Sequence, residues 1–204
     1  FRLDASSETL LLENDPDLIY LNEINEKYGA KEFLVLTYSP KSKMNSDESI
    51  RNLSELKNEL KSLKWVHNVV TLLDIPLLEA TDDGLIERIQ NFKTLTSKDI
   101  DKDSGFNEIL NSPVFRNFVI SEDGNTSGII VYIKPNQIED VKTDGELEVY
   151  KDKIKKERHQ NILEIREIIK NHNQNTQIYL GGIPMIADDM MTFIKKDIFT
   201  FGIG

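Results

Sequence analysis

The segment FLVLTYSPKSKMNSDESIRNLSELKNELKSLKWVHNVVTLL, residues 33–73, carries the clearest structural signals in the chain. Phe33–Tyr38 is a nearly continuous apolar run, short enough for a buried strand. Apolar side chains then recur every three or four residues over Ile50–Leu63, which predicts an amphipathic helix. Trp65–Leu73 is rich in valine and leucine and predicts a second strand, which Asp74-Ile75-Pro76 ends. The segment therefore indicates a strand–helix–strand unit.

The predicted helix ends are marked by capping residues. Asn45 and Glu48 have the spacing of a capping box, so we expect the helix over Ile50–Leu63 to begin there. Upstream, Asp15-Pro16-Asp17 predicts the start of another helix, and Gly29 predicts its end.

The stretch after Pro76, about residues 77–112, has weaker periodicity, and we interpret it as an insertion. A short helix is expected after Gly84, another over Asn107–Leu110, and a polar loop over Thr96–Gly105. The rest of the chain predicts a hairpin, a long helix, a strand and a final helix. The hairpin consists of the strand-like runs Phe115–Ser121 and Gly128–Lys134, joined by the turn Glu122–Asn125. The long helix has apolar residues from Leu147 to Ile169, the strand covers Gln177–Leu180, and the final helix covers Pro184–Lys196.

Without the insertion, the predicted order is strand, helix, strand, strand, helix, strand. This is the order of a ferredoxin-like split βαβ fold, in which both helices cover one face of an antiparallel sheet. The first half of the long helix is strongly polar, so we expect it to project into solvent or to pack loosely. We predict a single α+β domain over residues 1–204, with a mostly helical second lobe at about 77–112.

Composition excludes several classes of site. The net charge of −10 argues against a nucleic-acid-binding surface and against general attraction to anionic lipid. The absence of cysteine excludes disulfides, thiolate metal sites and a cysteine nucleophile. There is no glycine-rich phosphate loop, dinucleotide fingerprint or Gly-x-Ser-x-Gly elbow. We therefore expect no enzyme activity, no cofactor and no metal.

The polar residues that could carry chemistry favour structural roles. His67, His159 and His172 form no metal-binding pair, and we expect surface or structural positions for them. Asp99, Asp101 and Asp103 alternate as in a calcium loop, but the twelfth position of that loop falls on Leu110 instead of glutamate. A solvated acidic loop is the favoured interpretation.

Two charged groups lie toward the C-terminus. Lys155, Lys156, Arg158 and Arg166 form a basic patch on the long helix, interleaved with glutamates at pairing distance, and are interpreted as a solvated face. Asp188 and Asp189 are neighbours on a predicted helix, about 100° apart around its axis, so they do not form a carboxylate dyad. We expect one of them to cap or form a salt bridge while the other faces solvent.

The two ends of the sequence suggest an excised piece. It begins at Phe1 without a signal peptide, no stretch reaches the ~20 apolar residues of a membrane span, and Phe199–Gly204 turns apolar and stops. We expect a membrane helix to follow.

Several segments resemble, in order, the exporters of the RND superfamily, MMPL branch. The stretch Leu180–Asp197, LGGIPMIADDMMTFIKKD, resembles the segment before the second membrane helix of that family. The other similar segments are Phe1–Asp4 with Asn14-Asp15-Pro16, Glu32–Pro40, Leu73–Leu78, Ser112–Phe115 through Asp123-Gly124, and His159–Ile169. Together they cover nearly the whole chain.

The resemblance implies a porter domain between the first and second membrane helices, on the periplasmic or extracellular side of a cytoplasmic-membrane protein. It also implies proton-driven export of a lipid or other hydrophobic substrate, attachment to the membrane through flanking helices, and possible homo-oligomers. Gly181, Gly182, Pro184, Asp188 and Asp189 correspond to a segment that could couple porter and membrane motion. The proton-carrying acids of the family lie in the membrane helices, so none is assigned to this chain.

Three alternatives stay open. Within the superfamily, the chain could belong to a protein-translocation accessory or a sterol-sensing transporter. A stand-alone ferredoxin-like module that binds a small regulatory ligand is the second. The third is a metal-dependent enzyme that brings Asp99, Asp101 and Asp103 together with another acid.

Overall fold

A four-stranded antiparallel sheet forms the centre of the protein. The computed structural model describes residues 19–20, 23, 32–79, 92–135 and 143–202. Its strands and helices, in chain order, are β1 (Phe33–Pro40), α2 (Asp47–Ser62), β2 (Val66–Val70), the 3-10 helix η2 (Leu72–Asp74), α4 (Lys102–Asn111), β3 (Ser127–Ile133), α5 (Asp144–His172), β4 (Thr176–Gly181) and α6 (Ile183–Phe201).

The sheet order is β2-β3-β1-β4, and each neighbouring pair is antiparallel. The two central strands, β1 and β3, pair from Phe33 opposite Tyr132 to Tyr38 opposite Ser127. β4 extends the sheet beyond β1, with Gly181 opposite Val35. Consecutive strands along the chain are therefore separated in the sheet, except for β2 and β3.

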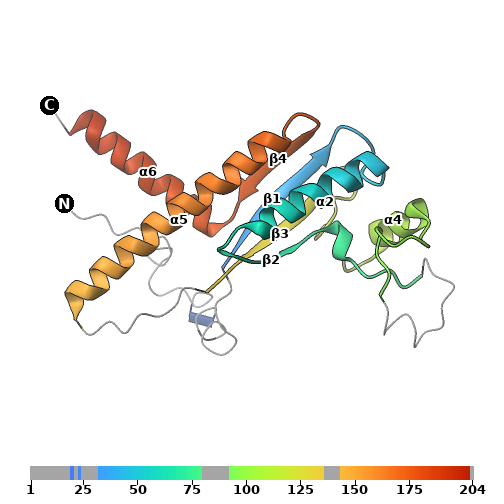
Figure 1. Ribbon diagram of the computed structural model, residues 1–204, viewed down its shortest axis with the longest axis horizontal. Coiled ribbons are helices and arrows are strands. Elements are labelled where there is room, and N and C mark those ends of the chain that lie inside the picture. The colour runs from blue at the N-terminus through green and yellow to red at the C-terminus, as the bar shows by residue number, and fades with distance from the viewer. Residues whose placement is uncertain (1–18, 21–22, 24–31, 80–91, 136–142, 203–204) are drawn as a thin grey trace.

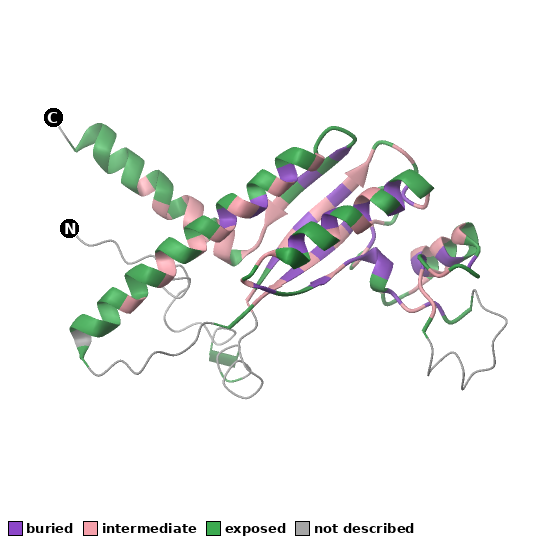
Figure 2. Ribbon diagram, viewed as in Figure 1, coloured by how far each residue is buried: buried purple, intermediate pink, exposed green. Residues whose placement is uncertain are grey.

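Helices α2 and α5 lie on the same face of this sheet (Figure 1) and contact each other. The strands alternate in burial, since successive side chains point to opposite faces. On β1, Leu34, Leu36 and Tyr38 face the helices and are almost fully buried. Leu53, Leu56 and Leu60 of α2 and Ile162 and Ile165 of α5 complete this core, which Figure 2 shows as a buried band between helices and sheet.

The cap of α2 differs from the prediction by one residue. Ser46, not Asn45, is the N-cap, and its hydroxyl accepts a hydrogen bond from the backbone N–H of Ser49 at 3.2 Å. Asn45 instead donates from its side chain to Asp103 Oδ1 at 2.5 Å. The capping-box prediction was therefore wrong, because two adjacent polar residues both suited the N-cap position.

The second predicted strand is shorter than expected. β2 ends at Val70, and Leu72–Asp74 forms η2. Thr71 and Asp74 form a capping box there, in which the Thr71 backbone N–H donates to Asp74 Oδ2 at 2.8 Å. These side-chain bonds turn the chain while Leu72 and Leu73 stay buried, so an apolar run predicted a strand where a buried turn forms.

The first half of the predicted hairpin is not a strand. Residues 115–121 form turns and isolated bridges, and Phe115 C=O accepts from the N–H groups of Phe118 and Val119 at 3.2 and 2.8 Å. The tight turn itself is present, because Gly124 has φ 70° and Ser121 N–H donates to Thr126 C=O at 2.8 Å. β3 pairs with β1 and β2 instead, where it buries its apolar face.

The predicted helices that correspond to α2, α4, α5 and α6 were confirmed in type and corrected in extent. α4 begins at Lys102, so part of the loop predicted over 96–105 is helical, and α6 continues beyond Lys196 to Phe201. The polar first half of α5 is exposed, as expected. Of the helix predicted after Asp15-Pro16-Asp17, only residues 19, 20 and 23 are described, and these are helical; the helix predicted after Gly84 lies almost wholly outside the described residues.

Candidate functional site

Two adjacent glycines join the last strand to α6. Gly181 ends β4 opposite Val35, and Gly182 is the N-cap of α6 with φ 117° and ψ 154°. This backbone conformation is open almost only to glycine. A Cβ on Gly182 would lie 3.2 Å from the Phe33 carbonyl oxygen and 3.3 Å from Leu34 Cα. Gly182 therefore lets α6 begin directly against β1.

Pro184 lies in the first turn of α6, where a helix needs no backbone N–H from it. Ile186 N–H donates to Gly182 C=O at 3.1 Å and closes that turn. The prediction that the last helix begins at Pro184 agrees with this geometry to within one residue, since α6 begins at Ile183. The role of Gly181, Gly182 and Pro184 in coupling stays a prediction.

Asp188 and Asp189 both bind α5, which corrects the expectation that one of them faces solvent. Both oxygens of Asp188 lie 2.9–3.0 Å from His159 Nδ1. Both oxygens of Asp189 accept from Arg166 Nη2 at 2.8 Å. Neighbouring residues of a helix point about 100° apart, so the two carboxylates lie on opposite sides of the α6 surface that faces α5. Asp188 therefore contacts His159, and Asp189 contacts Arg166.

These two contacts hold α6 at a defined angle to α5 more than they add stability. The side chains of His159 and Arg166 are 46% and 44% exposed and those of Asp188 and Asp189 are 10% and 28% exposed, so solvent screens each pair from one side, and His159–Asp188 is an ion pair only when the histidine is protonated. Exposed ion pairs contribute about 0.2–1 kcal/mol each. We refer to His159–Asp188 and Arg166–Asp189 as the α5–α6 pairs.

The apolar face of α6 points away from α5. Large apolar side chains recur along this helix at intervals of three and four residues and are exposed, up to 63% at Phe193 and 82% at Phe201. The exposed members at this spacing are Ile183, Ile186, Met190 and Phe193, and Ile198, Phe199 and Phe201 of the last turns are exposed as well. No residue of α6 is buried, and Figure 1 shows the helix leaving the sheet. An ordinary amphipathic helix buries its apolar face, whereas α6 packs its charged face on α5 and exposes its apolar face.

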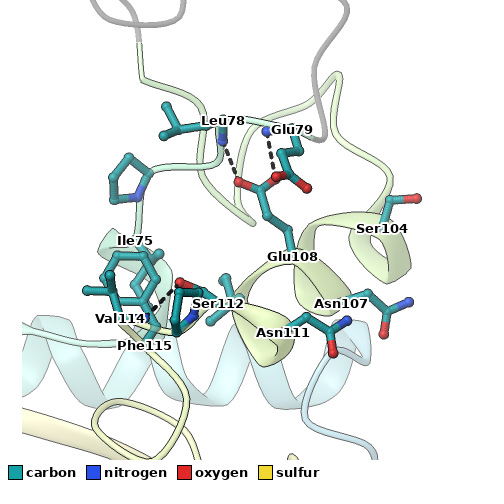
Figure 3. Close-up of a pocket in the computed structure, with 13 residues that line it drawn as sticks. Ile75, Leu78, Glu79, Ser104, Asn107, Glu108, Asn111, Ser112, Val114 and Phe115 are labelled. Carbon is teal, nitrogen blue, oxygen red and sulfur yellow. Dashed lines mark hydrogen bonds between the residues drawn. The ribbon is translucent and has the colours of Figure 1, made fainter.

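A second candidate site is a cavity of about 640 Å³ beside α4 (Figure 3). Residues of the segment after η2, of α4 and of the turn after α4 line it. They are Ile75, Pro76, Leu78, Glu79, Ser104, Asn107, Glu108, Ile109, Asn111, Ser112, Pro113, Val114 and Phe115. Most of the side chains on one side are apolar, and those of α4 supply most of the polar groups.

Hydrogen bonds tie the walls of this cavity together. The Glu108 carboxylate accepts from the backbone N–H groups of Leu78 at 2.5 Å and Glu79 at 3.0 Å, which joins the segment after η2 to α4 (Figure 3). Ser112 caps α4, and its hydroxyl accepts from Val114 N–H at 3.3 Å. The cavity was not predicted; the sequence signal that could have indicated it is the pair of apolar residues Leu78 and Val114 next to Pro76 and Pro113.

The remaining candidate residues have structural roles. Asp101 is the N-cap of α4, and the Ser104 backbone N–H lowers the pKa of its carboxyl. Asp103 accepts from Asn45, and Asp99 lies 4.0 Å from Lys93 Nζ. The acidic loop is thus partly a helix cap, and the described residues contain no cluster of three or more potential metal ligands.

The histidines and the basic patch agree only in part with expectation. His67 is exposed on β2, and His172 Nε2 lies 3.2 Å from Glu59 Oε1. Arg158 pairs with Glu32 and Arg166 with Asp189, so these arginines reach other elements instead of the glutamates of their own helix. The two arginines of the basic patch therefore contact other parts of the protein, which corrects their interpretation as a solvated face.

Among the described helices, none is both long enough and apolar enough to cross a membrane. The chain matches no protein-family model and no curated protein. Its resemblance to the MMPL branch therefore depends on the residues quoted above.

Proposed function

We propose that this chain is the extracytoplasmic porter domain of a proton-driven RND/MMPL-type membrane exporter, where it binds and guides a lipid or other hydrophobic substrate. In this proposal the domain lies on the periplasmic or extracellular side of the cytoplasmic membrane. In this proposal the domain binds the substrate and changes conformation, and the proton transfer that drives transport takes place in membrane helices outside residues 1–204.

The exposed apolar face of α6 is the observation that carries this proposal. Leaving side chains such as Phe193 and Phe201 in water forgoes roughly 1.5–3 kcal/mol each relative to full burial. A helix of this kind gains stability from an apolar surface outside the described residues. In an exporter, the membrane part of the protein supplies such a surface next to the segment that resembles the approach to the second membrane helix.

The core also supports the proposal. A βαββαβ order with the sheet order β2-β3-β1-β4 and antiparallel neighbours is that expected of a ferredoxin-like split βαβ core. We propose that the region around α4, between β2 and β3, is an inserted lobe of this core. Figure 1 places α4 at one end of the sheet, far from α5 and beside the N-terminal end of α2, where Lys102 of α4 pairs with Asp47 of α2.

Motion could pass between α6 and the sheet through two routes. Gly182 joins α6 directly to the edge of the sheet, and the α5–α6 pairs connect it to the helix that covers the sheet. A rotation of α6 would therefore displace β1, β4 and α5 together. Alternating access depends on such packed elements shifting as units. We propose this role for Gly181, Gly182, Pro184, Asp188 and Asp189.

The proposal is tested on the full-length natural protein. Cells that make it with a tag within these residues are fractionated, and intact spheroplasts are treated with protease. We expect the tag in the membrane fraction and cleaved from outside. Recovery in the soluble fraction, or protection from external protease, would refute the proposed location.

Transport is tested in membrane vesicles that hold the full-length protein, with efflux of a fluorescent lipid analogue followed after a proton gradient is imposed. We expect Asp188→Ala together with Asp189→Ala to slow efflux, and the exposed-site control Asp197→Ala to leave it unchanged. Gradient-independent efflux would count against the proton-driven mechanism. Size-exclusion chromatography of the same preparation tests the possible homo-oligomer.

The cavity beside α4 favours a second candidate, a stand-alone module that binds a small regulatory ligand. Pockets of a few hundred Å³ are of the size that holds small molecules. The same fractionation separates the two, because a regulatory module would be recovered as a soluble protein.

A further inference from the structure

The exposed side chains of α6 follow the seven-residue pattern of helices that pair with each other. With Ile183 as position a, the a and d positions of the helix are Ile183, Ile186, Met190, Phe193, Asp197 and Thr200. Ile194 and Phe201 take e positions and widen the apolar stripe. Within the part of the chain that the structure describes, all four apolar residues at a and d are exposed. We refer to these a, d and e positions as the α6 stripe.

Two charged residues beside the α6 stripe complement each other between antiparallel copies. Asp189 and Lys196 both take g positions, on one flank of the stripe. Asp189 lies three residues before Thr192, the middle residue of α6, and Lys196 lies four residues after it. A two-fold axis across the middle of two antiparallel helices brings their g positions together. Asp189 of each copy then lies beside Lys196 of the other, and such opposite charges determine which direction of pairing is favoured.

The same two-fold axis sets apolar residues against apolar residues. The pairs at equal height are Ile183 with Phe201, Ile186 with Ile198 and Met190 with Ile194. Asp197, the charged residue at an a position, falls opposite Ala187, whose small side chain leaves room for the carboxylate to reach solvent. A parallel pair in register would instead place Asp197 against its own copy, where like charges repel. The residues of α6 therefore favour antiparallel pairing.

The packing of α6 on the rest of the protein leaves the stripe accessible. Asp188 takes an f position and Asp189 a g position, and both bind α5. Met185, at a c position, packs against the core. Positions c and f lie on the side of a helix opposite a and d, so a second copy can approach the stripe without displacing α5. The bonds at 2.8 Å from Arg166 also hold Asp189 in place before that copy arrives, which lowers the entropic cost of pairing.

We infer that α6 is a dimerisation helix, which pairs antiparallel with α6 of a second copy of this chain through the α6 stripe and through Asp189 and Lys196. The inference goes beyond the proposed function, because the pairing is a property of this chain whether or not it belongs to an exporter. It is also compatible with that function. α6 ends at Phe201 with Gly202 as its C-cap, so a membrane helix that follows need not continue its direction, and two antiparallel α6 helices can lie along the membrane surface.

Sedimentation velocity of the isolated chain over a range of concentrations tests the pairing. We expect a reversible monomer–dimer equilibrium with a Kd on the order of 10 µM, because two helices of 19 residues form an interface at the small end of specific ones. A chain that stays monomeric at concentrations about a hundred times higher would overturn the inference.

Two neighbouring lysines test the geometry of the pair. Lys196→Glu places a negative charge beside Asp189 of the second copy at two positions per dimer, and it should weaken dimerisation about fivefold. Lys195→Glu makes the same change of net charge at an f position, which points away from the second copy, and should leave the Kd unchanged. Equal effects of the two variants would contradict the antiparallel arrangement.

Two phenylalanines test the apolar contact. Phe193→Ser removes an aromatic side chain from the stripe of both copies and should weaken dimerisation at least about tenfold. Phe118→Ser makes the same change in the turn after α4, where the side chain is 77% exposed, and should leave the Kd unchanged. Neither side chain belongs to the core, so circular dichroism should show both variants folded. Dimerisation of Phe193→Ser at the wild-type concentration would refute the role of the stripe.

Cross-linking tests the pair in cells that make the full-length natural protein. These residues include no cysteine, so a single introduced cysteine reports on α6, with any cysteine elsewhere in the protein replaced by serine. Met190→Cys, on the stripe near the two-fold axis, should give a cross-linked dimer with a short bis-maleimide. Thr192→Cys, exposed on the opposite side of the same helix, should not.

The competing occupant of the stripe is the membrane part of the exporter. If Met190→Cys does not cross-link in cells, another surface covers the stripe and the inference is wrong. If the fractionation experiment recovers the protein as soluble while Met190→Cys still cross-links, the exporter role is refuted and the pairing of α6 stands. The two failures are therefore distinguishable.

Discussion

Replacing Gly182 by alanine tests whether the turn into α6 requires glycine. The residue has φ 117° and ψ 154°, and an added Cβ would lie 3.2 Å from the Phe33 carbonyl oxygen and 3.3 Å from Leu34 Cα. Both contacts are to the backbone of a central strand, which cannot move without disturbing its pairing with β3 and β4.

The expected magnitude follows from two opposing effects. A non-glycine residue held in this region costs about 1–3 kcal/mol. Alanine also restricts the unfolded chain, which returns about 0.4–1 kcal/mol. The midpoints of these ranges give a net loss in the free energy of unfolding of about 1.3 kcal/mol, or a fall in Tm of about 3–5 °C for a chain of this size.

The adjacent glycine is the control. A Cβ on Gly181 would meet nothing closer than the Val35 carbonyl oxygen at 3.7 Å, and its φ is not positive. Gly181→Ala should therefore match wild type or exceed it slightly. Urea and thermal unfolding of the three proteins, followed by circular dichroism, give the comparison. If Gly182→Ala is as stable as Gly181→Ala, the reasoning about this turn is wrong.

Three further predictions concern caps and titrating groups. Burial raises the pKa of Tyr38, so above about pH 10 the unfolded chain loses a proton that the folded protein keeps, and stability falls as pH rises; Tyr38→Phe should flatten that fall in urea titrations at alkaline pH. Hydrogen bonds from the Ser121 hydroxyl and Asn125 lower the pKa of Asp123 to about 2 from an ordinary 3.8. The resulting stability is present above the ordinary value and is lost as pH falls toward 2, and acid unfolding of Asp123→Ala should lack this component. Asp101→Ala removes the N-cap of α4 and should lower the midpoint of urea unfolding, whereas Asp101→Ser should restore most of the loss; equal midpoints for the two variants would contradict the capping role.

Sequence periodicity predicted the main elements because it records which face of each element is buried. The apolar run Phe33–Tyr38 and the three- and four-residue spacing in Ile50–Leu63 correspond to β1 and α2. In α2, the buried apolar residues are Ile50, Leu53, Leu56 and Leu60, which the spacing selects. The same spacing predicted α5, and the polar composition of its first half predicted its exposure.

Apolar runs without a clear period were the source of error. Leu72-Leu73 and Phe115–Ile120 are as apolar as a strand, but side-chain and backbone hydrogen bonds fold them into turns. A strand also needs a partner at its edge, and β3 takes the position between β1 and β2. Contacts between residues far apart in the sequence decide which apolar run becomes the strand between β1 and β2, and local composition does not reveal these contacts.

The sequence by itself determined the strands and helices of the core, the beginning of the last helix near Pro184 and the absence of cysteine chemistry. Only the tertiary structure determined the partners of Asp188 and Asp189, because His159 and Arg166 lie 29 and 23 residues away and meet them where two helices cross. The cavity beside α4 likewise exists only where Ile75–Glu79 and Ser104–Phe115 are brought together. The physical reason is the same in both cases: spacing along a chain specifies faces, and only packing specifies which faces meet.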